Sequence, residues 1–410
     1  MRSAHQGIRA RGARTRGASD MPAAERAPQA GTEPQRILDE VRSRGHACEA
    51  EGLSIFLAED FGFCQGVEQA VARALAAARA LRAADPAIGG GEPGRLWVTG
   101  EIIHNPAINE ALRRAGAERL PPPESPDRLA AVRPADTVIV PAFGIEVDEE
   151  ERLRRIGCRV VDTTCGWVRR VWKAAREFSR AGLTVVIHGK REHEETRATA
   201  SRIDGPWIVV RDREEARRLA AWVSSAPDEG NGLLAAAGPG FDPPRHLARL
   251  GLVNQTTMLS AETEEIARIL RAALAARLGA EPGPKRFRVM DTLCPATQRR
   301  QDAVQRLIDE HPLDLLIVVG GFRSSNTAHL ARIGRARVPS YHVEDADCLI
   351  DRRRIRHLPA GAEGPVVTEG WLPDGQRVIG VSAGASTPDQ ETGRILLGLL
   401  ALRARPEGEP

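Results

Sequence analysis

One local pattern constrains the fold of this chain more than any other feature, because it occurs three times. Two apolar runs end in nearly the same letters, RVVDTTCGW at 159–167 and RVMDTLCPA at 288–296, and IFLAEDFGFCQG at 55–66 repeats the order with different residues. In each, a strand-like run leads to an Asp, a short turn, one cysteine and a segment with helical periodicity. The three cysteines are Cys64, Cys165 and Cys294.

The repeat continues past each helical segment. A second apolar run follows (RLWVTG, LTVVIHG or LDLLIVVGG), and each of these runs opens into a polar loop. Alternating strands and helices predict parallel sheets with ligand sites beyond the carboxyl ends of the strands. Three such units around one centre would bring all three cysteines and all three polar loops together. We therefore expect an α/β fold, a pseudo-threefold trefoil of three αβ domains with small parallel sheets.

The spacing of the cysteines fits one compact αβ domain for each of them. We expect domains at 53–164, 165–293 and 294–410, the last with a C-terminal segment, and a disordered extension at 1–52. The first 19 residues contain five Arg and no acidic residue, which resembles a transit peptide. A disordered tail, or a true start at Met21, is the simpler interpretation of that segment.

The composition argues against several classes of function. Acidic residues nearly balance the basic ones (net charge +3), and no basic stripe with interleaved aromatic residues occurs, so nucleic-acid binding is not expected. No apolar run approaches the roughly 20 residues that span a bilayer, so no membrane segment is expected. Six cysteines without a secretory signal argue against a disulfide framework and favour a cytoplasmic location. We interpret Cys48, Cys158 and Cys348, which lie outside the repeat, as structural or incidental.

Three converging cysteines predict a metal centre. A thiolate at a helix N-terminus is stabilised by the helix dipole and by nearby N–H groups. Three thiolates are one fewer than the usual four of a [4Fe–4S] cluster, which leaves one iron open for a substrate oxygen. The alternative, a Cys3His zinc site, normally has closely spaced ligand pairs, which this sequence lacks.

The polar loops supply the groups that bind a diphosphate. They contain His104 and Asn105, then His188, His193, Glu194 and Glu195, then Ser324, Ser325 and Asn326, and finally Ser382 and Ser386. Hydroxyl, amide and imidazole groups at helix starts bind phosphates where no phosphate-binding loop with its lysine is present. Singly, each motif has an ordinary explanation, since SSN at a helix start is more often a cap. A carboxyl group kept in such a site, at Glu195, is a candidate proton donor whose pKa neighbouring negative charge would raise.

Nine segments then identify a family. In order they are FGFCQGVEQAV, GEIIHNP, PAFGIEVDEE, VVDTTCGWVRRVW, IHGKREHEETRATAS, VNQTTMLSAETEEI, DTLCPATQRRQDAV, VVGGFRSSNTAHL and SAGASTPD. Together they resemble the 4-hydroxy-3-methylbut-2-enyl diphosphate reductase (LytB) family from about Leu53 to Asp389. The sequences of several of these motifs are similar to those of the plant and cyanobacterial branch of the family.

The resemblance implies an iron–sulfur oxidoreductase at the last step of the non-mevalonate isoprenoid pathway. Such an enzyme removes the hydroxyl group of its allylic diphosphate substrate reductively and forms isopentenyl and dimethylallyl diphosphate. The implied cluster ligands are Cys64, Cys165 and Cys294, and the implied catalytic residues are Glu195 and Thr256, with Thr257 as the second choice for the threonine. The implied substrate-binding residues are His104, His193, Thr256, Ser324, Ser325, Asn326 and Ser386.

Two departures from the family pattern stand out. Many bacterial members have a third histidine where this chain has Phe143, so that ligand is not carried over. The plant-type branch often has Trp after the first cysteine, where this chain has Gln65.

Three expectations follow for function and partners. A ferredoxin or flavodoxin is expected to donate electrons transiently, since no flavin or nicotinamide motif is present. A second trefoil enzyme with three cysteines and a [4Fe–4S] cluster, quinolinate synthase, is the alternative, although its carboxylate substrates would favour arginine or backbone clamps. An iron–sulfur sensor is the non-enzymatic alternative.

Overall fold

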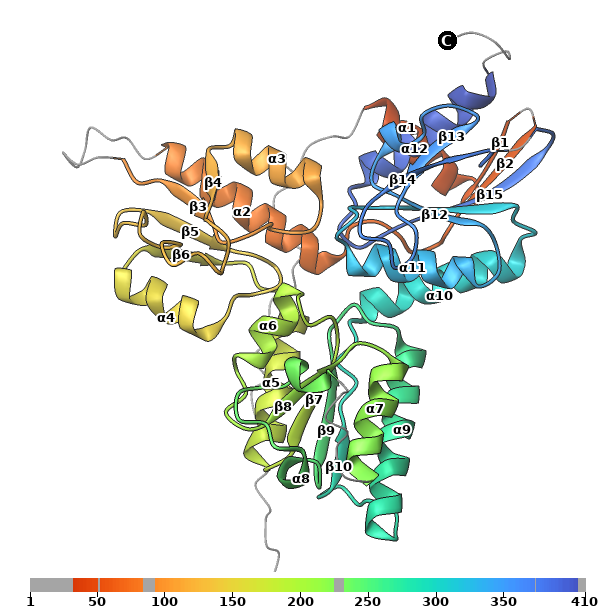
Figure 1. The fold of residues 1–410 in the computed structure, drawn as a ribbon. Helices are drawn as coiled ribbons and strands as arrows, with labels where there is room; N and C mark the ends of the chain where they lie inside the picture. Colours follow the sequence, from red (N-terminus) through yellow and green to blue (C-terminus); the bar gives the residue numbers. More distant parts are fainter. Residues whose placement is uncertain (1–31, 51, 84–92, 225–231, 373, 405–410) are drawn as a thin grey trace, which may run out of the picture.

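The structure is a computed structural model that describes residues 32–50, 52–83, 93–224, 232–372 and 374–404. Three lobes surround a common centre, and each lobe has its own small sheet (Figure 1). The predicted pseudo-threefold α/β trefoil is thereby confirmed.

The first lobe has a parallel sheet in the order β4-β3-β5-β6. Its strands are β3 (Leu96–Val98), β4 (Ala117–Arg119), β5 (Thr137–Val140) and β6 (Arg159–Asp162). Its helices are α2 (Gln65–Ala83), α3 (Pro106–Arg114) and α4 (Val147–Ile156). Buried alanines of α2, including Ala70 and Ala74, pack with Ile139 on one face of the sheet, and Trp97 and Val138 belong to a second apolar cluster.

The second lobe has a parallel sheet in the order β10-β9-β7-β8. Its strands are β7 (Thr184–His188), β8 (Trp207–Val210), β9 (Leu250–Asn254) and β10 (Phe287–Val289). Its helical segments are α5 (Gly166–Arg180), α6 (Glu194–Ala200), α7 (Arg213–Ser224), η3 (Leu233–Ala236), α8 (Pro243–His246) and α9 (Ser260–Leu278). Helix α5 buries Val171 and Phe178 in one apolar cluster, whereas α7 and α9 contribute Leu219 and Leu270 to another.

The third lobe has a five-stranded sheet in the order β1-β2-β15-β11-β12, parallel except for β1. Its strands are β1 (Ala47–Ala50), β2 (Leu53–Leu57), β11 (Leu315–Val319), β12 (Ser340–Val343) and β15 (Arg377–Ala383), with a hairpin of β13 (Arg354–His357) and β14 (Val366–Glu369). Its helical segments are α1 (Glu33–Ser43), α10 (Pro295–Glu310), α11 (Ser325–Arg335), η4 (Ala346–Cys348) and α12 (Asp389–Ala404).

The N-terminal segment corrects one prediction. Residues before Leu53 were expected outside the fold, but those at 33–50 form α1 and β1 and belong to the third lobe. The physical reason is burial, because α1 places Leu38 and Val41, each at most 1% exposed, in the core of that lobe. Residues 1–31 lie outside the described residues.

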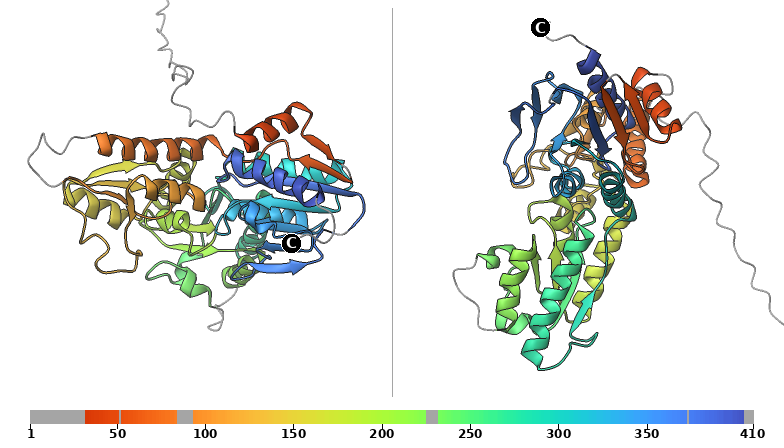
Figure 2. Two further views of the ribbon diagram at one scale, coloured as in Figure 1. Left: turned by 90° about the horizontal axis from the view of Figure 1, so that it is seen from above. Right: turned by 90° about the vertical axis from the view of Figure 1, so that its right-hand side faces the viewer.

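The chain passes from one lobe to the next at each cysteine of the repeat. Strand β2 lies in the sheet of the third lobe, and the helix after Cys64, α2, packs in the first lobe. In the same way Cys165 joins β6 of the first lobe to α5 of the second, and Cys294 joins β10 of the second to α10 of the third. The predicted first domain at 53–164 therefore begins with a strand of the third lobe. The three crossings meet at one place, because Cys64, Cys165 and Cys294 line the same cavity. Figure 2 shows the lobes from above and from the side.

None of the helices in the described ranges is long and apolar enough to cross a membrane.

Candidate active site

The three cysteines of the repeat line one central cavity. Cys165 and Cys294 occupy the N-cap positions of α5 and α10, and Cys64 directly precedes α2. The backbone packs closely on the sulfur atoms, since a Cβ added to Gly66 would lie 2.8 Å from the Sγ of Cys165 and 3.9 Å from that of Cys64. The other three cysteines, Cys48, Cys158 and Cys348, do not line this cavity.

The electrostatics around the thiols favour a cationic occupant. Burial raises the pKa of the Cys165 and Cys294 thiols, and the neighbouring Cys64 thiol acts in the same direction. N–H groups of the first helical turns oppose this rise, those of Trp167 and Val168 at Cys165 and those of Ala296 and Thr297 at Cys294. Thiolates that repel one another in a buried place are stabilised when a metal centre binds them.

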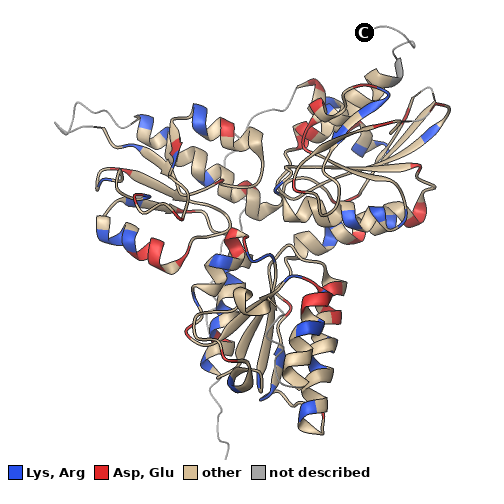
Figure 3. Cartoon of the chain, in the orientation of Figure 1, with Lys and Arg blue, Asp and Glu red and all other residues tan. Residues whose placement is uncertain are grey.

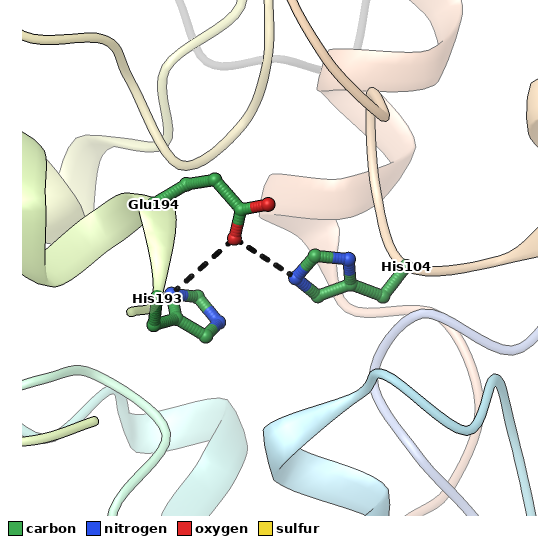
Figure 4. A group of neighbouring side chains, drawn as sticks. All are labelled: His104, His193 and Glu194. Atoms are coloured by element: carbon green, nitrogen blue, oxygen red, sulfur yellow. Dashed lines mark ion pairs between the residues drawn. The ribbon is translucent and has the colours of Figure 1, made fainter. Parts of the chain in front are cut away.

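A second group of side chains lies at the meeting point of the first and second lobes. Glu194 places its carboxylate between His104 (3.5 Å to Nε2) and His193 (3.9 Å to Nδ1) (Figure 4). The other ring nitrogen of His104, Nδ1, lies 2.9 Å from the carboxylate of Glu101. Although burial lowers the pKa of His104, hydrogen bonds to Glu101 and Glu194 outweigh it and raise this pKa above its usual value. A carboxylate lies at each ring nitrogen of His104, which favours the protonated imidazole.

His193 is neutral, and its tautomer follows from its contacts. Complete burial and the positive charge of His104 lower its pKa to about 3. Its Nδ1 accepts a hydrogen bond of 3.1 Å from the backbone N–H of Glu195. The proton of the neutral ring therefore lies on Nε2, which makes that atom a hydrogen-bond donor.

Glu195 and Thr256 form a buried pair. The N–H and the Oγ1 hydroxyl of Thr256 donate to Oε1 and Oε2 of Glu195, at 2.7 and 2.8 Å. Burial raises the pKa of Glu195 to about 7, and the two hydrogen bonds from Thr256 oppose this shift. The hydroxyl of Thr257 instead accepts from the side chain of Gln255, so the contact favours Thr256 over Thr257 as the partner of this acid.

The serine and asparagine residues form the third side of the cavity. Ser324 is the N-cap of α11 and accepts from the N–H of Thr327, so the expected cap role applies to this residue. The Oγ of Ser325 and the Nδ2 of Asn326 are buried and have no hydrogen-bond partner in the described part of the chain. Asn326 is held by the N–H of Ala385, which donates to its Oδ1. Ser386 lines the same cavity.

Not every polar residue of the loops reaches the cavity. Asn105 is the N-cap of α3 and accepts from Ile108, and His188 contacts Thr263 at 2.8 Å away from the site. Ser382 is buried in β15 and does not line the cavity.

Phe143, which stands where the sequence resemblance implied a third histidine in many members, packs against His104 and His193. Its ring stacks on His104 with a centroid distance of 4.4 Å and meets His193 edge-on at 5.3 Å. It also lines the cavity, so an apolar ring occupies this side. The packing fixes the orientation of both imidazoles without adding a hydrogen-bonding group.

Sequence reasoning missed two residues at the edge of the site, Glu101 and Arg323. Arg323, just before Ser324, lies 3.1 Å from Glu101 of the first lobe and 3.1 Å from Glu194 of the second. The three lobes are thus joined by one arginine. Both residues could have been found from the sequence, because Glu101 and Arg323 lie in the polar loops that carry His104 and Ser324.

The comparison with known families decides the identity of the fold. A protein-family model described as LytB protein matches residues 55–399. The chain belongs to this family. LytB relatives named 4-hydroxy-3-methylbut-2-enyl diphosphate reductase occur in Thermosynechococcus vestitus (41% identical over 90% of this chain and 89% of the relative) and in Gloeobacter violaceus (41% over 90% and 87%).

A solved LytB structure shows the same fold. The E-1-hydroxy-2-methyl-but-2-enyl-4-diphosphate reductase of Plasmodium falciparum matches 85% of this chain and 87% of that chain with a TM-score of 0.59 and 19% identity. The two relatives from Thermosynechococcus vestitus and Gloeobacter violaceus are cyanobacterial, which agrees with the similarity of the motif sequences to the plant and cyanobacterial branch.

Proposed function

We propose that this LytB chain is a 4-hydroxy-3-methylbut-2-enyl diphosphate reductase. The substrate would lose its hydroxyl group as water, taking up two electrons and two protons, and would become isopentenyl or dimethylallyl diphosphate. One observation carries the proposal: three cysteine thiols, one acid with a raised pKa and a set of phosphate-binding groups line the same cavity. The names of the relatives agree with this reaction.

The residues present fit a [4Fe–4S] cluster held by Cys64, Cys165 and Cys294. The fit rests on the convergence of three half-buried thiols at helix starts and on the backbone contact at Gly66. When bound, such a cluster supplies electrons one at a time and an iron with an open position. A Cys3His zinc site is less compatible, because a single zinc ion needs its ligand atoms close together. Among the described residues, the one group whose ligand atoms all lie within 4.8 Å of one another is His104, His193 and Glu194, which contains no cysteine.

The diphosphate would bind between the lobes. The His104 imidazolium and the Nε2–H of His193 supply donors from two lobes, and Ser325 and Asn326 supply donors from the third. The start of α11 adds N–H groups and the positive end of the helix dipole. Ser324, Ser386 and Thr256 complete the lining of the cavity.

No arginine lines this cavity in the described part of the chain. A carboxylate substrate would be expected to need one, so the alternative, a quinolinate synthase-like reaction, is not favoured.

The protons would pass through Glu195 and Thr256. A carboxyl group with a pKa of about 7 is half protonated near neutral pH and can give its proton to the leaving hydroxyl. The Thr256 hydroxyl, 2.8 Å from Oε2, can accept that proton and pass its own to the substrate. Since the pair is buried, bulk water does not compete for the proton.

The test is anaerobic turnover of 4-hydroxy-3-methylbut-2-enyl diphosphate with dithionite-reduced methyl viologen, with the two products identified. Glu195→Gln is expected to abolish product formation and to keep the iron content and cluster absorbance. Near-normal turnover of Glu195→Gln would refute the role of this acid. Absence of product with the wild-type protein and an intact cluster would refute the proposed function.

A further inference from the structure

The pseudo-threefold fold allows the three cysteine-bearing helices to be compared with one another. Helices α2, α5 and α10 each begin directly after a cysteine of the repeat and extend away from the centre. The proposed function requires two electrons, and a protein that delivers them to the cavity would approach the outer side of one of these helix starts. The residue after each cysteine, Gln65, Gly166 and Pro295, is exposed.

Only α5 has a strongly basic outer face. Helix α5 contains five basic residues and one acidic residue. Helix α2 contains three basic residues and one acidic residue, and α10 contains three of each. The basic residues of α5 are all exposed and are together called the α5 basic face: Arg169, Arg170, Lys173, Arg176 and Arg180. The buried side of the same helix carries only apolar residues such as Val171 and Phe178. The α5 basic face therefore takes no part in packing the helix against the lobe.

The acids near this face leave much of its charge unpaired. Asp162 pairs with Arg169, and Glu177 lies 3.9 Å from Lys173. No acidic partner is found for Arg170, Arg176 or Arg180 among the residues that the structure describes. In the other two lobes, blue basic and red acidic segments lie on the same helices in this view (Figure 3).

The α5 basic face is directly connected to the cavity. Trp167, in the first turn of α5, lines the central cavity, and the Arg170 guanidinium lies 4.9 Å from the centroid of its ring. With a rise of 1.5 Å per residue, Arg170 and Lys173 lie about 7.5 and about 12 Å along the helix from Cys165. A protein bound to Arg170 and Lys173 would therefore lie close to the start of α5, which carries the Cys165 thiol.

We propose that the α5 basic face is the docking surface for the electron donor, a small electron-transfer protein with an acidic surface. This inference rests on the proposed function. Each encounter would oxidise one donor and deliver one electron, so two encounters and two protons serve one substrate. Complementary charge speeds such encounters while keeping them weak, as transient redox complexes require.

The test uses the anaerobic holoenzyme and an acidic [2Fe–2S] ferredoxin in its oxidised state. Binding is measured by calorimetry at low and at high ionic strength. Lys173→Glu/Arg176→Glu removes the basic character of α5, and Arg73→Glu/Arg79→Glu makes the same change of charge on the exposed side of α2. We expect the α5 variant to weaken binding at low salt by about tenfold or more and the α2 variant to change it much less.

Several outcomes would overturn the inference. Equal weakening by both variants would show attraction by net charge alone, and an unchanged affinity of the α5 variant would show docking elsewhere. Failure of the wild-type holoenzyme to bind the ferredoxin at low salt would also count against it. Cluster absorbance checks that each variant is intact. Product formation by the wild-type protein with reduced viologen tests the proposed function separately, so the two failures are distinguishable.

Discussion

The hydroxyl of Thr256 lies 2.8 Å from Oε2 of Glu195, and the backbone N–H of the same threonine lies 2.7 Å from Oε1. One residue thus holds both carboxyl oxygens of a buried acid. Only the hydroxyl can transfer a proton, whereas the N–H fixes the orientation of the carboxyl group. The two roles can therefore be separated by substitution.

Replacement of Thr256 by Val should remove the relay and keep the backbone contact. We expect turnover to fall by about a hundredfold or more, in the range typical for loss of proton transfer, whereas Thr256→Ser keeps most of the activity. The measurement is steady-state turnover with a chemical reductant. Thr257→Val is the matched control, because that hydroxyl contacts Gln255. A larger loss in Thr257→Val than in Thr256→Val would reverse the assignment.

The raised pKa of Glu195 predicts a pH dependence of activity. Because the proposed proton donor is the protonated form of Glu195, the kcat/KM of the wild-type protein should decrease above about pH 7. A profile that stays flat to pH 9 with a chemical reductant would contradict this role.

The same pKa predicts a pH dependence of stability. The folded protein binds the proton of Glu195 more tightly (pKa about 7) than the unfolded chain (4.5). Stability from this group is therefore full below pH 4.5 and is lost as the pH rises to 7. Relative to Glu195→Gln, the wild type should lose about 3 kcal/mol of unfolding free energy over that interval. Denaturant midpoints of both proteins at pH 5 and pH 8 would measure this, and a constant difference would disprove it.

The contact at Gly66 predicts a specific effect on the metal centre. Gly66→Ala would place a Cβ 2.8 Å from the sulfur of Cys165, closer than such contacts normally are. We expect lower iron content and weaker cluster absorbance after anaerobic reconstitution. Gly166→Ala is the control, because nothing lies within 4 Å of the added Cβ. Equal iron content in both variants would contradict a packed metal centre at this position.

Glu194 occupies a place where the diphosphate would bind His104. Although burial raises the pKa of Glu194, the hydrogen bond to His104 and the positive charge of that ring lower this pKa more, so Glu194 is an anion in the free protein. Because a substrate anion has to displace it, Glu194→Gln should lower the KM for the diphosphate severalfold. Glu192→Gln removes the same charge two residues away and should change KM little. A raised KM in Glu194→Gln would instead indicate that this carboxylate helps to bind substrate.

The local repeat predicted much of this architecture. A strand, a cysteine and a helix recur because the chain folds the same way at each corner, and local periodicity records that. The lobe to which each strand belongs could not be read in this way. Strand β2 pairs with β15 at the other end of the chain, and no local pattern encodes a pairing between such distant segments.

The candidate site shows the same division. The histidines, the acid and the Ser-Ser-Asn turn follow strands of the repeat and could be grouped from the sequence. The contacts of Arg323 with Glu101 and Glu194, and the stacking of Phe143 on His104, depend on how three lobes meet. Side chains that interact only across lobes leave no periodic signal.

The pairing of β2 with β15 also sets the order in which the protein can be completed during its synthesis. Residues 53–57 leave the ribosome long before their partner in the sheet, Arg377–Ala383, is translated. Until then the corner that carries Cys64 has no sheet to fix it, whereas the corner of Cys165 can already form from its own neighbours. Iron loading is therefore expected only after β15 has left the ribosome, and a truncation that removes β15 should abolish it even though every cysteine is still present.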